Sequence, residues 1–263
     1  MKTKFSLITV FSDFAHNIRG NVSAVVELNS LIEEEQMQII ASDLNQPATT
    51  FIWKAKGKNS YNIRWFAPDA EISLCGHGSL AATAYLAKAN EQGNISLVYK
   101  QGIVIGKSEG KSLCSIELDS ISVIEELEVP AVLKDGLGIE IKGYFSTGGK
   151  FIVLAESEAA VKDMKPNFSI LKTSEVFSYA VTAKGKEVDF VSRTLVPHVQ
   201  QLEDPATGSS HAALTPFWAV RLQKNRMKAL QLSKRGGSFT CELDGNKVKL
   251  FGKYEILAEG KIL

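Results

Sequence analysis

The two halves of this chain resemble each other, and this constrains its fold more than any other feature of the sequence. Three landmarks of the first half recur in the second at an offset of 129 or 130 residues: Gly20-Asn21 and Gly149-Lys150, Arg64-Trp65-Phe66-Ala67-Pro68 and Arg193-Thr194-Leu195-Val196-Pro197, Gly78-Ser79 and Gly208-Ser209. The offset is close to half of the 263 residues. A constant offset of this size predicts two duplicated domains.

Each half also contains one long run without a charged residue. Residues 72–87 and 205–220 lack Asp, Glu, Lys and Arg over 16 residues each. Both runs hold a Gly-Ser pair followed by an alanine-rich stretch, which predicts a helix that begins at the small residues. A helix without a charged face is normally buried on all sides. The sequence therefore predicts an α+β fold in which each domain is a barrel-like sheet around a central helix.

Hydrophobic patterning predicts further elements around these two helices. Ser30-Leu31-Ile32-Glu33 has the spacing of a capping box before a helix over 34–44, and a short helix is expected over 159–165. Strands are expected over 5–11, 49–56, 60–66, 95–100, 113–118, 143–145, 151–155, 179–183, 188–194, 238–243 and 248–251. This pattern predicts domains over 1–116 and 117–263, with the last strand packing back on the first domain.

The charge balance argues against nucleic acid or a membrane as partner. The chain has 30 Lys and Arg against 29 Asp and Glu, and no apolar run reaches the roughly 18 residues of a membrane-spanning helix. One basic stretch is expected to be a solvated helix face and turn: Lys224, Arg226, Lys228, Lys234 and Arg235. The three cysteines are too few for a disulfide framework. We therefore expect a cytoplasmic protein.

Two further patterns that suggest a bound group are weak. Gly76, Gly78 and Ala81 match a relaxed dinucleotide fingerprint, but polar residues 69–71 follow the preceding strand and no acidic residue ends a second strand about 20 residues on. The four histidines, at 16, 77, 198 and 211, lack the spacing of metal ligands. We expect neither a metal nor another cofactor.

The starts of the two charge-free helices are the candidate site. A helix N-terminus presents backbone N–H groups and a partial positive charge, and glycine lets an anion approach them closely. His77 lies at the first start, and Asp204, Thr207, Ser209 and Ser210 lie at the second. Histidine exchanges protons near neutral pH, and a carboxylate can orient or polarise a bound group. This combination predicts a small carboxylate-bearing substrate.

The same residues carry a resemblance to a known family. The motifs are Gly20-Asn21, Arg64-Trp65-Phe66-Ala67-Pro68, Glu71-Ile72-Ser73-Leu74-Cys75-Gly76-His77-Gly78 and Glu203-Asp204-Pro205-Ala206-Thr207-Gly208-Ser209-Ser210-His211. In this order they resemble the PhzF-like phenazine-biosynthesis isomerases. The resemblance implies a fold like diaminopimelate epimerase, a site between the two domains, a proton-shift isomerisation without a cofactor, and a homodimer.

The resemblance also implies roles for individual residues. His77 and Asp204 match the residues that act on the substrate. The substrate-binding positions are expected to be Gly76, Gly78, Ser79, Thr207, Gly208, Ser209 and Ser210. The sequence departs from the family at one important place, because the position of the family's acid/base glutamate is occupied by Ala48. Alanine cannot transfer a proton.

Three hypotheses follow from this departure. The first is an isomerase that uses His77 and Asp204 on a substrate of its own. The second is a cofactor-independent racemase or epimerase, for which Cys75 matches a first thiol but Thr207 stands in the place of a second. We expect Cys75 to be a structural thiol instead. The third is a small-molecule-binding protein that has lost catalysis with the glutamate.

Overall fold

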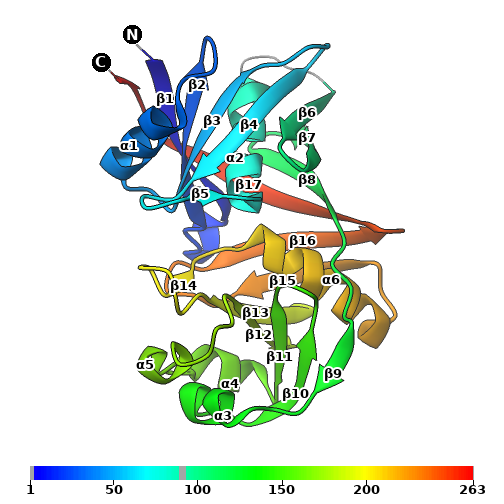
Figure 1. Ribbon diagram of the computed structural model, residues 1–263. Helices are drawn as coiled ribbons and strands as arrows, with labels where there is room; N and C mark the ends of the chain where they lie inside the picture. Colours follow the sequence, from blue (N-terminus) through cyan, green and yellow to red (C-terminus); the bar gives the residue numbers. More distant parts are fainter. Residues whose placement is uncertain (1–2, 89–92, 263) are drawn as a thin grey trace. The chain divides into compact units, whose positions relative to one another are not determined.

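The computed structural model describes residues 3–88 and 93–262, and the chain divides into two units. Unit 1 is Met1–Leu118 with Lys249–Leu263, and unit 2 is Asp119–Val248. Unit 1 contains β1 (Thr3–Ser12), the short 3-10 helix η1 (Phe14–His16), β2 (Asn21–Leu28), α1 (Glu34–Leu44), β3 (Ala48–Lys54), β4 (Ser60–Phe66), β5 (Glu71–Ile72), α2 (Gly76–Lys88), β6 (Asn94–Tyr99), β7 (Gly102–Gly110), β8 (Leu113–Asp119, to Leu118) and most of β17 (Lys247–Ile262) (Figure 1). Unit 2 contains β9 (Glu125–Leu127), α3 (Ala131–Leu137), β10 (Ile141–Ser146), β11 (Phe151–Ala155), α4 (Glu158–Asp163), α5 (Phe168–Leu171), β12 (Tyr179–Lys184), β13 (Phe190–Leu195), β14 (Glu203–Asp204), α6 (Gly208–Leu222), β15 (Arg226–Gln231) and β16 (Gly237–Asp244).

The strands of unit 1 close into an eight-stranded barrel around α2. The order of pairing is β1, β2, β3, β4, β6, β7, β8, β17 and back to β1. Figure 1 shows the closing contact as the red β17 beside the blue β1. The helix is buried over most of its length, and a Cβ at Gly106 of β7 would lie 2.1 Å from the Thr83 hydroxyl. Glycine there lets the barrel wall approach the helix closely.

Unit 2 repeats this sheet strand for strand. In unit 1 β2 is parallel to β3, β3 is antiparallel to β4, β4 is parallel to β6, and β6 is antiparallel to β7. The series β11, β12, β13, β15 and β16 shows the same directions in the same order. The central helix α6, like α2, is largely buried. The predicted α+β fold of two duplicated, helix-centred domains is confirmed.

Each sheet carries a second helical layer on its outer face. In unit 1, Met37 and Ala41 of α1 pack with Phe51 and Phe66 in one buried cluster. In unit 2, the cluster beneath α3, α4 and α5 includes Leu133, Val161 and Leu171, none of which is exposed. The sheets are therefore apolar on both faces, which explains why strands such as β11 read as continuous hydrophobic runs.

Most predicted elements lie within a residue or two of the observed ones, with three clear exceptions. Helix 34–44 is present, but its N-cap is Glu33 without a side-chain capping bond, so the predicted capping box at Ser30 is wrong. Strand β7 was not expected. The basic stretch was expected to include a helix face, but Arg226 and Lys228 belong to strand β15.

A buried ion pair lies at the equivalent place in each unit. Arg64 of β4 donates to both carboxylate oxygens of Glu71 at 2.7 and 2.8 Å. Arg193 of β13 donates to both carboxylate oxygens of Glu203, each at 2.8 Å. We call these the strand-end ion pairs, because each ties the two-residue strand β5 or β14 to its neighbour just before the central helix begins. Bidentate pairing fixes geometry as well as adding energy.

His211 of α6 is a core residue. It is fully buried, its ring stacks on Phe239 at 3.7 Å between centroids, and its Nδ1 lies 2.8 Å from the Thr207 carbonyl oxygen. Burial lowers the pKa of His211 to about 4, since the charged ring has no water around it. The expectation that His211 packs inside the second central helix is confirmed.

The Arg193–Glu203 pair should contribute measurably to stability. The two side chains are 11% and 19% exposed, so Arg193→Met leaves a carboxylate largely buried without its partner. We expect the free energy of unfolding to fall by about 2–4 kcal/mol in urea titrations. The matched control is Arg226→Met, which removes a pair with Glu242 that is 62% exposed on the arginine side. There the loss should stay below about 1 kcal/mol, and equal losses would contradict the argument.

The buried His211 should make the protein less stable in mild acid. Its pKa is lower in the folded state than the unfolded value of about 6.5, so the unfolded chain binds a proton that the folded chain does not. Stability is then complete above pH 6.5 and falls as the pH drops from 6.5 to 4, by up to about 3 kcal/mol. Urea titrations of His211→Phe over this range should show a shallower slope than the wild type. His16→Gln, at a side chain that is 74% exposed, should keep the wild-type slope.

Candidate active site

In unit 1, the start of α2 brings a thiol and an imidazole together. The Cys75 Sγ lies 3.4 Å from Nδ1 of His77 and accepts the backbone N–H of Gly78 at 3.3 Å. Cys75 and His77 are 5% and 6% exposed. The first turn is held further by Ser79, whose hydroxyl donates to the Cys75 carbonyl at 2.7 Å. We call Cys75, Gly76, His77 and Gly78 the unit 1 helix start.

Gly78 is needed at this helix start because the barrel wall lies against it. A Cβ at this position would come within 2.6 Å of both the Thr50 hydroxyl and the Trp65 ring. Thr50 in turn hydrogen-bonds with the Ser23 hydroxyl at 2.8 Å, and Ser23 donates to the Ala48 carbonyl at 3.0 Å. Ala48 begins β3 and is fully buried. At the position of the family glutamate, this chain therefore has a buried methyl group.

In unit 2, the start of α6 is organised by a hydrogen-bonded triad. The Thr207 hydroxyl donates to the Asp204 carboxylate at 2.6 Å. Gln231 of β15, which is 1% exposed, accepts the Thr207 backbone N–H at 2.8 Å and donates to the Asp204 carbonyl at 2.5 Å. Gly208 and Ser209 follow as the first two residues of the helix. We call Asp204, Thr207, Gly208 and Ser209 the unit 2 helix start.

The predicted serines do not all have the same surroundings. Ser79 and Ser210 are fully buried, and the Ser210 hydroxyl accepts a bond from the Thr194 hydroxyl at 3.1 Å. Their side chains thus tie each helix to its own unit. Ser209 is partly exposed.

The structure corrects the pairing of the two helix starts. The sequence paired Gly78 with Gly208, but the helices begin at Gly76 and Gly208, 132 residues apart. The strand-end carboxylates, Glu71 and Glu203, are also 132 apart, whereas their arginine partners keep the offset of 129. Cys75 therefore corresponds to Thr207, and His77 to Ser209.

Lys150 is a residue that the sequence marked only as a landmark. It follows the Gly148-Gly149 turn between β10 and β11, and its carbonyl accepts both the N–H and the hydroxyl of Thr147, at 3.0 and 2.8 Å. Its side chain is partly buried and interacts electrostatically with Asp204. Burial lowers the pKa of Lys150, and the Asp204 charge opposes that shift. The signal in the sequence was its equivalence to Asn21.

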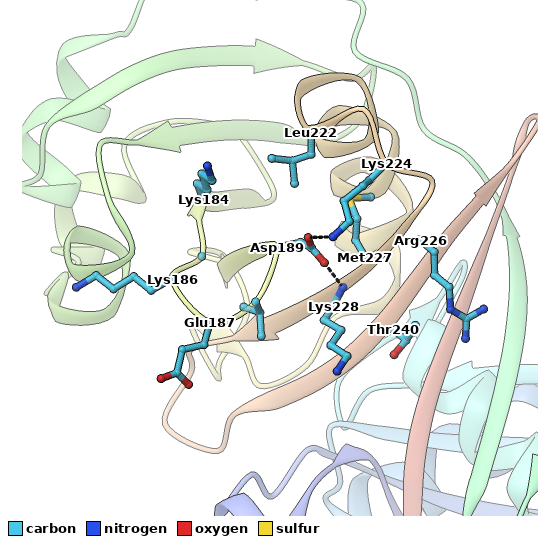
Figure 2. A pocket seen from close by; sticks show the side chains of 12 residues that line it. Lys184, Lys186, Glu187, Asp189, Leu222, Lys224, Arg226, Met227, Lys228 and Thr240 are labelled. Atoms are coloured by element: carbon cyan, nitrogen blue, oxygen red, sulfur yellow. Dashed lines mark hydrogen bonds and ion pairs between the residues drawn. The ribbon is translucent and has the colours of Figure 1, made fainter.

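A separate hollow of about 630 Å³ lies at the other end of α6. Figure 2 shows Asp189 at its centre, paired with the Lys224 ammonium and with the backbone N–H of Lys228. The side chains of Lys184 and Lys186 are drawn pointing away from Asp189 (Figure 2). The hollow is thus charged and open, and its cations do not converge on one point.

No arrangement of His, Cys, Asp and Glu suited to a metal ion occurs within residues 3–88 and 93–262. In the same residues, every helix is too short or too polar to span a membrane.

Comparison with known proteins identifies the family. An uncharacterized isomerase of Pseudomonas aeruginosa is 34% identical over 265 residues, covering 100% of this chain and 99% of that protein. A crystal structure of a phenazine biosynthesis protein of the PhzF family from Enterococcus faecalis superposes with a TM-score of 0.90 at 31% identity, covering both chains fully. A predicted epimerase of Pseudomonas aeruginosa, 16% identical with a TM-score of 0.77 over 99% of each chain, shares the fold.

The family profile described as phenazine biosynthesis-like protein, PhzC-PhzF, matches residues 8–260. This span includes both helix starts and both strand-end ion pairs. The chain therefore belongs to the PhzF family of phenazine biosynthesis-like proteins.

Proposed function

We propose that this protein is a cofactor-independent isomerase that shifts a proton within a small carboxylate-bearing metabolite. One observation carries the proposal: the same helix start is built twice, with a proton-carrying side chain at each, His77 in unit 1 and Asp204 in unit 2. Similarity to proteins named as isomerases supports the reaction class.

The helix starts would hold the substrate carboxylate. The first N–H groups of a helix have no acceptor within the helix and favour an anion. In unit 2 the Thr207 N–H is used by Gln231, so Gly208 and Ser209 offer the next N–H groups, together with the Ser209 hydroxyl. In unit 1 Gly76 takes this role, while Gly78 contributes by having no side chain.

Proton transfer would use groups from both units on one substrate molecule. His77 can accept or donate a proton at either ring nitrogen, and the thiol of Cys75 at 3.4 Å holds the ring in place. The Asp204 carboxylate accepts the Thr207 hydroxyl and stabilises positive charge that forms beside it. Isomerisation needs one proton removed and one returned, with no net gain or loss.

Solvent exchange tests this reaction directly. A panel of small aromatic, unsaturated and amino carboxylates is incubated with the protein in D₂O and followed by proton NMR. We expect deuterium to enter one of them, and His77→Ala to slow this exchange at least about 100-fold, the usual contribution of a general acid or base. His198→Ala, an exposed histidine on the Ser174 carbonyl, is the control and should exchange at the wild-type rate. Full exchange by His77→Ala would refute the role of His77.

The contact between Cys75 and His77 favours a second candidate, a racemase or epimerase in which the thiol takes part in proton transfer. The equivalent residue in unit 2 is Thr207, so a mechanism with two thiols does not fit. This candidate predicts inversion of a stereocentre and loss of exchange on thiol alkylation. Binding of a carboxylate with no exchange at all would instead indicate a protein that has lost catalysis.

We also propose a cytoplasmic homodimer. The cytoplasmic location follows from the absence of a disulfide framework, since Cys75, Cys114 and Cys241 are all free and buried. The dimer follows from the family resemblance, and light scattering measures it.

A further inference from the structure

A proton shift needs a base, and the residue at the family's glutamate position cannot supply one. Ala48 is buried at the start of β3, and its nearest polar neighbour, Ser23, uses its hydroxyl on the Ala48 carbonyl. His77 is one protonatable group at the helix starts. The second has to come from elsewhere in the chain.

Lys150 has the surroundings of such a group. Its backbone is fixed by the two bonds from Thr147, so the side chain starts from a rigid point. It lies in unit 2, near enough to Asp204 for their charges to interact. Glu203, the other carboxylate of β14, is engaged by Arg193 in a bidentate pair. Asp204 is therefore the charged group that faces Lys150.

The environment suits a lysine that works without its charge. An amine removed from water loses its preference for the charged form and becomes a base near neutral pH. The pKa of Lys150 is lowered in this way, mainly by burial. The equivalent residue of unit 1 is Asn21, which is fully buried and cannot titrate. The two units therefore differ at this position by one proton-transfer group.

We propose that Lys150 is the catalytic base of the proton shift, in place of the missing glutamate. The neutral amine removes a proton from a carbon of the bound carboxylate substrate, and the electron pair of that C–H bond moves into the adjacent conjugated system. Protonated His77 delivers a proton to the carbon at the far end of the shifted double bond. The ammonium of Lys150, stabilised by Asp204, then loses its proton to water and His77 regains one. This assignment rests on the proposed function.

Two substitutions separate proton transfer from simple charge. Lys150→Met removes the amine, whereas Lys150→Arg keeps the positive charge but cannot deprotonate. With the carboxylate that the wild type exchanges in D₂O, both variants should be slower by about 100-fold or more. Lys172→Met, at an exposed lysine of unit 2, is the control and should match the wild type. If Lys150→Arg retains wild-type exchange, Lys150 acts by charge alone and the proposal is wrong.

The pH dependence gives an independent readout. The rate should rise with pH as Lys150 loses its proton, and Asp204→Asn should move this rising limb to lower pH, because the carboxylate favours the ammonium. NMR of ¹³C-dimethylated lysines, assigned with Lys150→Arg, measures the titration without any substrate. Titration near the ordinary value of about 10.4 would overturn the proposal.

These outcomes distinguish the two levels of inference. If the wild type exchanges a carboxylate and Lys150→Arg does so equally, the proposed function stands and the assignment to Lys150 falls. If the wild type exchanges none of the panel while Lys150 titrates low, the isomerase proposal falls, and the role of Lys150 as its base falls with it.

Discussion

Burial of a helix that has no charged face determines the architecture of both units. A helix such as α2 cannot lie on a surface without exposing apolar area to water, so a sheet has to surround it. Once it is enclosed, its first backbone N–H groups are the polar atoms that the enclosure leaves at one end. A binding site for an anion is then a by-product of packing, and charged side chains are not needed to make it. This explains how a chain with a net charge of +1 can be built to attract a carboxylate.

The strand-end ion pairs turn this general property into a defined site. Two-residue strands such as β14 have little pairing of their own, and the Arg193–Glu203 pair holds the chain in place before α6. Asp204 is the next residue, so its direction depends on that pair. The same device stands before α2. What differs between the units is the polar group placed on each scaffold, His77 on one and Asp204 with Lys150 on the other, so that duplication supplied the frame and later divergence the chemistry.

The sequence predicted the parts of this structure that depend on local pattern or on repetition. Strands β4 and β11 were predicted at their observed bounds, because they are continuous apolar runs between polar turns. Strand β15 was missed because its cations hid the alternation of buried and exposed residues. The helix starts were found, but their pairing was two residues off, since a Gly-Ser pair occurs at different places in the two turns. Lys150 was beyond reach, because its burial and its proximity to Asp204 arise only from tertiary packing.

The closure of the unit 1 barrel by β17 makes the order of synthesis matter. Thr3 pairs with Ile262 across almost the whole chain, so the barrel has to wait for its last strand while β1 to β8 are already made. Contacts of such long sequence separation are slow to form, and unpaired strand edges invite aggregation meanwhile. Unit 2, whose strands are contiguous from 119 to 248, can fold first. During translation, the edges of β1 and β8 are therefore the surfaces that chaperones would have to protect.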